Sequence, residues 1–250
     1  IEYAGNTQDA GSQDFGGAGV NCFSACPLIK NNVIRYSAGD GIRIFGENQR
    51  ITGNRIHSNN RGIYVSANLS VPETGVEGYG LIENNYMMYN AQGIYLSSIN
   101  GSEVDIINNT IMSASQEIYG SCLSINLYRH PEPAEIRVYK NHMESEAGNA
   151  IAITELESES DNQLTLSDNN IMNKSEGRLS LYLYQWMTET PGSFTMAGNW
   201  WGTSDTEEID ELIYDAENDF YLPEVAYDPA AVETIPDAGS EVSYPPRANA

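Results

Sequence analysis

A short pattern built around asparagine recurs seven times along the chain, and it constrains the fold more than any other feature. In each copy an apolar residue is followed by two spacer residues, an Asn, one further spacer and a large apolar residue. The recurring residues are Asn32, Asn54, Asn85, Asn109, Asn141, Asn169 and Asn199. Their spacing of 22 to 32 residues is typical of proteins built by stacking similar units.

A second signature follows most copies of the first. It is a small residue followed by two apolar residues that flank one variable residue, as at 41–44, 62–65 and 93–96, with weaker copies at 117–120, 150–153 and 179–181. Alternation of apolar and polar residues within such short segments indicates β-strands. Each unit is therefore predicted to hold three short strands separated by turns.

No single unit can bury its apolar face, whereas stacked units with parallel strands in register bury a continuous core. An Asn at the same turn of every coil would then hydrogen-bond to the Asn residues above and below it. The coils that exceed the 22-residue minimum place insertions along one side of the stack, at 66–79, 120–133, 155–163 and 184–193.

The two signatures resemble the right-handed parallel β-helix repeat family of secreted, polysaccharide-associated bacterial surface proteins. The resemblance covers residues 17–202, and an incomplete first coil is expected over 1–20. It implies an all-β fold, a right-handed single-stranded parallel β-helix of about eight coils. The alternative, a β-sandwich with Asn-rich turns, would not keep this register.

Three regions are predicted: a parallel β-helix over 1–202, a C-terminal cap over 203–229 and an acidic tail or linker rich in Pro, Ala and Ser over 230–250. An open β-helix needs a cap, because its last coil exposes unpaired backbone groups. Two adjacent Trp residues and a short amphipathic helix are suited to that role: Trp200 and Trp201, then Ile209, Leu212 and Ile213 on one side of the helix. The alternative is that the Trp pair stacks on sugar rings.

The charge balance restricts the partners. The chain has 12 Lys and Arg against 35 Asp and Glu, a net charge of −23. Because binding to phosphates requires a basic face, this argues against nucleic acid and anionic membrane surfaces. No apolar run approaches the roughly 18 residues of a membrane-spanning helix, so membrane insertion is not expected. The family resemblance implies an extracellular or cell-surface location.

Alternation also predicts an outward column of side chains on the strands of the second signature: Arg43, Tyr64, Tyr95, Tyr119, Ala152 and Ser180. Tyrosine offers sugars an apolar ring and a polar hydroxyl. We therefore predict that Arg43, Tyr64, Tyr95 and Tyr119 bind a ligand. The alternative is that the stacked tyrosines only protect the sheet.

A basic cluster is predicted on the strands after the Asn turn, where Arg35, Arg55 and His57 face outward in neighbouring coils. Polyuronate lyases of this fold class need a base near the sugar C5 proton and a cation for the developing enolate. These three residues are the catalytic candidates, and ordinary solvated surface residues are the alternative. Calcium would be the usual companion, but no specific carboxylate site for it is found. Glu83 and Asp105 are the best carboxylate pair for a hydrolase.

Two functions follow from these patterns. The first is an extracellular module that binds a polysaccharide or cell-surface glycan, with cleavage, by a lyase rather than a hydrolase reaction, as its catalytic version. The second is a non-catalytic structural or adhesive surface protein, or a filament subunit that associates with itself and uses the β-helix as a rigid scaffold.

Overall fold

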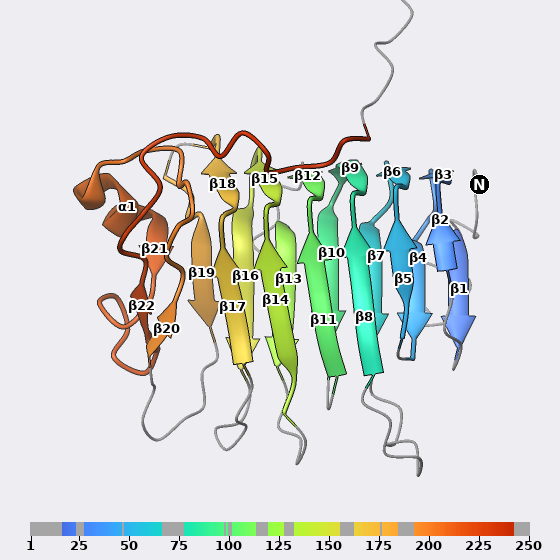
Figure 1. Cartoon of the computed structure of the whole chain (residues 1–250), viewed down its shortest axis with the longest axis horizontal. Coiled ribbons are helices and arrows are strands. Elements are labelled where there is room, and N and C mark those ends of the chain that lie inside the picture. Colours follow the sequence, from blue (N-terminus) through green and yellow to red (C-terminus); the bar gives the residue numbers. More distant parts are fainter. Residues whose placement is uncertain are drawn as a thin grey trace, which may run out of the picture.

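The chain folds into a parallel β-solenoid in a computed structural model (Figure 1). The structure describes residues 17–23, 28–46, 48–66, 78–97, 99, 102–113, 120–127, 133–155, 163–175, 177–184 and 193–242. Three parallel sheets run along the solenoid axis, and each coil contributes one strand to each sheet.

The three sheets correspond to the three strands predicted for each unit. Sheet 1 precedes the Asn turn and contains β2 (Leu28–Lys30), β5 (Arg50–Thr52), β8 (Gly78–Glu83), β11 (Ser102–Ile107), β14 (Glu135–Tyr139) and β17 (Gln163–Ser167). Sheet 2 follows the Asn turn and contains β3 (Val33–Arg35), β6 (Arg55–His57), β9 (Tyr86–Asn90), β12 (Thr110–Ser113), β15 (His142–Ser145) and β18 (Asn170–Asn173). Sheet 3 carries the second signature and contains β1 (Val20–Phe23), β4 (Asp40–Phe45), β7 (Arg61–Ser66), β10 (Gln92–Ser97), β13 (Ser121–Leu127), β16 (Asn149–Glu155), β19 (Leu181–Tyr184) and β21 (Ile213–Tyr214).

The prediction of about eight coils was wrong, because the solenoid has about five turns. Sheets 1 and 2 each contain six strands. The seventh Asn repeat, at Asn199, does not add a full coil. There β20 (Ser193–Thr195) pairs with β22 (Glu224–Ala226) instead of extending sheet 1, and Trp200 makes only an isolated bridge with Asn170. The predicted first coil over 1–20 lies mostly outside the described residues.

The core lies inside the tube formed by the sheets and consists of aligned apolar columns. The sheet 2 column, for example, is fully buried and contains Ile34, Ile56, Met87, Ile111, Met143 and Ile171. Parallel pairing in register places each of these side chains next to its equivalent in the neighbouring coils. Burial of these columns is the main driving force for stacking.

The predicted asparagine ladder is present. From Asn54 to Asn199, the side-chain oxygen of each ladder Asn accepts two hydrogen bonds of 2.9–3.1 Å from the preceding ladder Asn, one from its backbone N–H and one from its side-chain amide. A second ladder at the corner between sheets 2 and 3 joins Asn59 to Asn90 through the same two bonds. These ladders satisfy backbone groups that the turns would otherwise leave unpaired.

The residue before each ladder Asn has a left-handed backbone conformation. The positions are Asn31, Gly53, Asn84, Asn108, Lys140, Asp168 and Gly198, with φ between 51° and 78°. Asn and Gly tolerate this conformation better than other residues. The requirement explains why the repeats so often contain Asn-Asn or Gly-Asn pairs.

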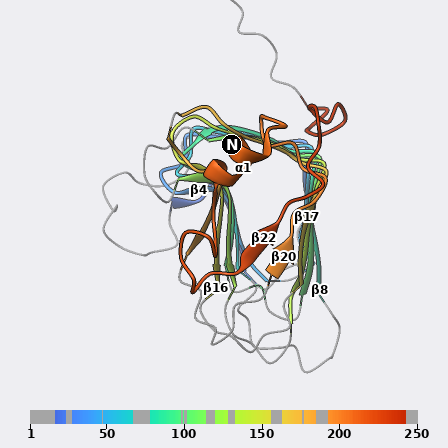
Figure 2. The same ribbon diagram turned by 90° about the vertical axis from the view of Figure 1, so that its left-hand side faces the viewer.

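The C-terminal end of the solenoid is closed by the cap. Helix α1 (Thr206–Leu212) begins at Asp205, whose side chain accepts a hydrogen bond from the backbone N–H of Glu207. Directly after the helix, β21 adds the last strand to sheet 3, and β20 and β22 lie across the end (Figure 2). Trp201 and Ile209 are buried against the last coil, so the Trp201 ring is not open to a sugar.

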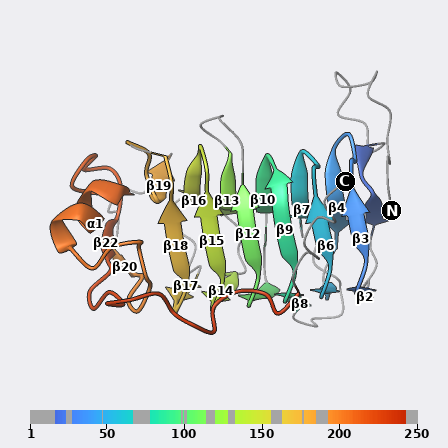
Figure 3. The same cartoon turned by 90° about the horizontal axis from the view of Figure 1, so that it is seen from above.

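The first part of the predicted tail lies along the solenoid. Residues 230–242 run back across several coils on the side of sheet 2 (Figure 3). Asn170 exchanges two hydrogen bonds with the backbone of Ile235, and the Ser240 hydroxyl donates to Asn84. This part of the tail is therefore attached to the β-helix, and residues 243–250 lie outside the described residues.

Candidate functional site

Tyrosines stand on the outward face of sheet 3, as the alternation predicted. Strand register places Arg43 beside Tyr64 and Tyr64 beside Tyr95. The rings of Tyr64 and Tyr95 stack with their centroids 5.4 Å apart and an angle of 15° between their planes. The structure therefore brings together three of the four residues predicted to bind a ligand.

Beyond Tyr95 the predicted column is confirmed at Ala152, which pairs with Ser124 and Tyr182, but differs at the other two positions. Tyr119 lies outside the described residues, and the strand that follows it in sequence, β13, places Ser124 beside Tyr95. Two coils further on, Tyr182 instead of Ser180 faces outward, because the preceding Leu181 pairs with the buried Ile151. In both coils the weak copy of the second signature lacked its glycine, so the residues alone did not fix the register.

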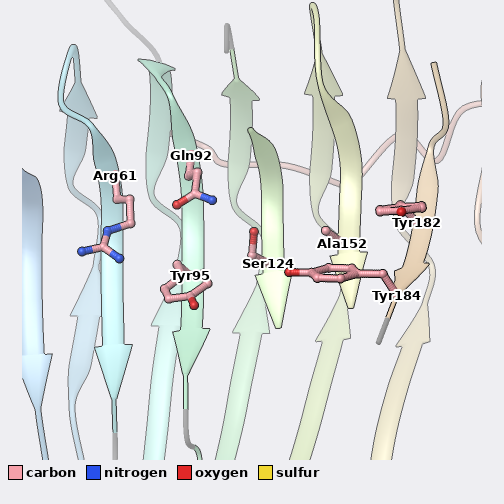
Figure 4. A pocket seen from close by; sticks show the side chains of 7 residues that line it. All are labelled: Arg61, Gln92, Tyr95, Ser124, Ala152, Tyr182 and Tyr184. Carbon is pink, nitrogen blue, oxygen red and sulfur yellow. The ribbon is translucent and has the colours of Figure 1, made fainter. Parts of the chain in front are cut away.

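A hollow crosses the outward face of sheet 3 between tyrosine side chains. It has a volume of about 200 Å³ and is lined by Arg61, Gln92, Tyr95, Ser124, Ala152, Tyr182 and Tyr184. Tyr95 stands at one end and Tyr182 at the other, the small Ser124 and Ala152 lie between them, and the Tyr184 ring extends from β19 toward Ser124 (Figure 4). We call this hollow the tyrosine groove.

Aromatic stacking holds the two ends of the tyrosine groove in place. Tyr182 and Tyr184 stack with centroids 5.4 Å apart, and Tyr214 of the cap packs against Tyr182 at 5.2 Å. At the other end the side-chain amide of Asn126 donates a hydrogen bond of 2.7 Å to the Tyr95 hydroxyl. The groove walls are thus ordered before any ligand arrives.

Arg61 covers the aromatic column at the first end of the groove. Its guanidinium carbon lies 4.3 Å from the ring centroid of Tyr64 and 5.4 Å from that of Tyr95. The fully buried carboxylate of Asp40 accepts hydrogen bonds from Arg61 at 2.6 and 3.2 Å and also from Arg43. Two arginines on one carboxylate leave a local positive charge beside the groove.

Sequence reasoning missed Arg61 and Gln92 as members of the site. Each lies three residues before an outward tyrosine, so strict alternation assigned it to the opposite face. Alternation is interrupted in both strands, because two successive residues are buried, Gly62 with Ile63 and Gly93 with Ile94. A side chain at either glycine would collide with neighbouring atoms 2.7 and 2.2 Å from its Cβ. The available signal was a repeated order within this chain, a polar residue followed by Gly, Ile and Tyr at 61–64 and again at 92–95.

The predicted basic cluster is assembled on sheet 2, away from the groove. Pairing of β3 with β6 places Arg35 beside His57, and the buried Ile56 between Arg55 and His57 makes both of these face outward. However, only 7% of His57 is exposed, and the Tyr36 ring packs edge-on against it at 5.5 Å. Burial, together with the Arg35 charge, lowers the pKa of His57. The imidazole is neutral but shielded from a polymer chain.

The predicted carboxylate pair is separated by the strand register. Glu83 lies beside Ile107, whereas Asp105 lies beside Arg137 in the other outward column of sheet 1. Arg137 donates to Asp105 at 2.6 Å, and the Tyr79 hydroxyl donates to the same carboxylate at 2.7 Å. Asp105 is therefore held in an ion-pair network.

Within the described residues, no group of three or more His, Cys, Asp or Glu side chains is arranged to hold a metal ion. In the same part of the chain, no helix has the length and apolar character needed to cross a membrane. The calcium considered from the sequence thus has no ligand set among these residues.

Comparison with known proteins agrees with the solenoid architecture. Residues 10–188 match the model of a family described as the right-handed β-helix region. No curated protein and no solved structure gives a significant match to the chain. The family match covers more than half of the sequence and includes all strands from β1 to β19 of Figure 1. The chain belongs to the right-handed β-helix region family.

Proposed function

We propose that the tyrosine groove binds a segment of a polysaccharide or cell-surface glycan, with the β-helix as its rigid support. The observation that carries this proposal is that Tyr95 faces Tyr182 and Tyr184 across a floor of Ser124 and Ala152 (Figure 4). Sugar rings present C–H faces that stack on aromatic rings, and their hydroxyls hydrogen-bond to polar side chains. The proposal includes an extracellular or cell-surface location, where the chain would meet such glycans.

The groove has the dimensions of an oligosaccharide site. Tyr95 on β10 and Tyr182 on β19 are three strand steps apart in sheet 3, which corresponds to about 14 Å at roughly 4.8 Å per step. The floor side chains are small and recessed, with 5% of Ser124 and 6% of Ala152 exposed. A chain of a few sugar rings would therefore lie along the solenoid axis, with an aromatic contact at each end.

The proposal is for binding without cleavage in the groove. Its seven lining residues include no carboxylate and no histidine. General acid–base catalysis most often uses a His, Glu or Asp side chain within hydrogen-bonding reach of the transferred proton, and the proposal assigns the groove tyrosines to stacking. The lyase candidates Arg35, Arg55 and His57 lie on sheet 2, so cleavage would be a separate activity of a different face.

A glycan array followed by titration of the strongest ligand tests the proposal. Tyr95→Ala and Tyr182→Ala should each weaken binding at least tenfold, because a packed aromatic anchor contributes more than about 1.4 kcal/mol. Tyr139→Ala, on the outward face of sheet 1, is the matched control and should leave affinity unchanged. Absorbance of unsaturated sugars, measured on acidic polysaccharides, detects lyase turnover. Equal binding by all variants would contradict the proposal.

A further inference from the structure

The charges are distributed very unevenly along the solenoid axis. The segment 17–66, which contains the first strands of all three sheets, has six basic and two acidic residues, a net charge of +4. The cap segment 203–229 has ten acidic residues and no Lys or Arg. Residues 1–16, outside the described part of the chain, add three acidic residues. Within the described residues, the N-terminal coils and the cap therefore have opposite charges.

The positive charges surround the first two coils. The basic residues lie on all three sheets: Lys30 and Arg50 on sheet 1, Arg35 and Arg55 on sheet 2, and Arg43 and Arg61 on sheet 3. A ligand bound to one face would need cations on that face only. Cations on every side instead make the whole end of the solenoid positive, which favours a partner that contacts the end.

The same end exposes apolar side chains. Phe23, Leu28 and Val33 are 51%, 65% and 41% exposed. They lie on β1, β2 and β3, which are the terminal strands of sheets 3, 1 and 2. Large apolar residues gathered in this way at one end of a molecule are typical of a protein–protein contact.

The C-terminal end has the complementary character. Figure 2 looks onto this end, where α1 and β22 lie in front. Exposed carboxylates are provided by Glu207, Glu208, Asp210, Glu211, Glu217 and Glu224. A hollow of about 400 Å³ between α1, β21 and β22 is lined by several of them. The turn between β21 and β22 exposes the aromatic pair Phe220 and Tyr221, whose ring centroids are 3.9 Å apart.

We infer that copies of this chain associate head to tail, with the basic N-terminal coils of one copy against the acidic cap of the next. The contact joins two different surfaces, so it repeats along an axis instead of closing into a symmetric dimer. At physiological ionic strength charges are screened beyond about 8 Å. The attraction between touching ends then persists, while repulsion between the acidic bodies of the two copies is weakened. The inference does not depend on the proposed function of the tyrosine groove.

Sedimentation velocity over a concentration series tests this association. In about 0.15 M NaCl the chain should form oligomers whose size grows with concentration, and in about 1 M NaCl it should be monomeric because the end charges are screened. Lys30→Glu with Arg50→Glu, both exposed on sheet 1, should raise the dissociation constant at least tenfold. Lys140→Glu with Tyr89→Glu, exposed positions at turns of interior coils, adds similar negative charge and should have little effect.

Mixing complementary variants makes the test specific for the two ends. Glu211→Lys with Glu217→Lys reverses charge on the cap and should also prevent association. A mixture of the basic-end and cap variants should associate again, because each supplies the end that the other needs. A wild-type chain that is monomeric at all concentrations would overturn the inference. So would a monomer that binds dextran sulfate through Lys30 and Arg50, which would make the basic end a polyanion site.

Discussion

The side-chain oxygen of Asn109 accepts two hydrogen bonds from Asn85, one from the backbone N–H and one from the side-chain amide, both at 3.0 Å. The same amide of Asn85 also donates to the carbonyl of Ile51 in the preceding coil. One side chain therefore connects three coils at a fully buried corner. This relationship explains why the repeat tolerates insertions elsewhere but keeps its Asn.

Replacing Asn85 with Leu should lower the free energy of unfolding by about 1–3 kcal/mol, because buried backbone groups lose their partners. Urea denaturation measures this change. Asn32→Leu, at the N-terminal end of the ladder where the side chain is partly exposed, should cost less. Equal effects at the two positions would mean that the ladder does not stabilise the interior more than the end.

Lys140→Gly should stabilise the protein by about 0.5–1 kcal/mol. Lys140 has a φ of 56°, and glycine adopts this left-handed conformation without the steric cost of a Cβ. Thr165→Gly, an exposed strand position on β17, is the control and should destabilise because glycine is unfavourable in strands. Both variants are compared by thermal and urea unfolding. Destabilisation by Lys140→Gly would show that the lysine side chain outweighs the backbone strain.

Stability should fall as the pH drops below about 6.5. Burial lowers the pKa of both His57 and His142 in the folded chain from an ordinary value of 6.5. The unfolded chain then binds more protons than the folded chain in acid, so the stabilisation is complete above the unfolded pKa and is lost as the pH falls below it. Urea unfolding measures the free energy of unfolding at pH 7.5 and at pH 5.5. The difference between these two values should be smaller in the double variant His57→Gln/His142→Gln than in the wild-type chain. An unchanged difference would assign the pH dependence to other groups.

High salt should preserve or increase the stability of the monomer. The 35 acidic residues repel one another, and salt screens that repulsion. Thermal unfolding is followed in dilute protein between low and molar NaCl, with the Lys30→Glu/Arg50→Glu variant included so that association does not contribute. A melting temperature that decreases with salt would contradict the expectation.

The repeats of the sequence predicted the sheets but not their number of coils. Isoleucine columns and ladder asparagines recur in register, so the identity of inward residues such as Ile56 and Asn85 followed from periodicity. The coil count failed at Asn199, because the repeat continues there while the chain turns into the cap. Nothing in the local pattern distinguishes a repeat that closes the solenoid from one that extends it.

Among the aromatic residues of the groove, Tyr95 was predicted, where the second signature is strong, and Tyr182 was missed, where it is weak. Arg61 was missed because its place on the outward face depends on the interrupted alternation at Gly62 and Ile63, which are both buried. Arg61 and Asp40 lie in neighbouring coils, so their contact could be predicted only with the register of strands β4 and β7. The net charge of the sequence was enough to restrict the classes of partner. Assigning the basic and acidic segments to opposite ends of the solenoid required the order of the coils.

The most direct test of the central claim is titration of an oligosaccharide into a chain whose tyrosine groove is filled. Ala152→Trp places a large side chain on the groove floor without removing any aromatic residue and without disturbing the core, because Ala152 faces outward. Isothermal titration calorimetry with the strongest array ligand should show binding to the wild-type chain and loss of that binding in Ala152→Trp, with unchanged unfolding. Undiminished affinity in the filled variant would contradict the account, because it would show that the glycan binds outside the tyrosine groove.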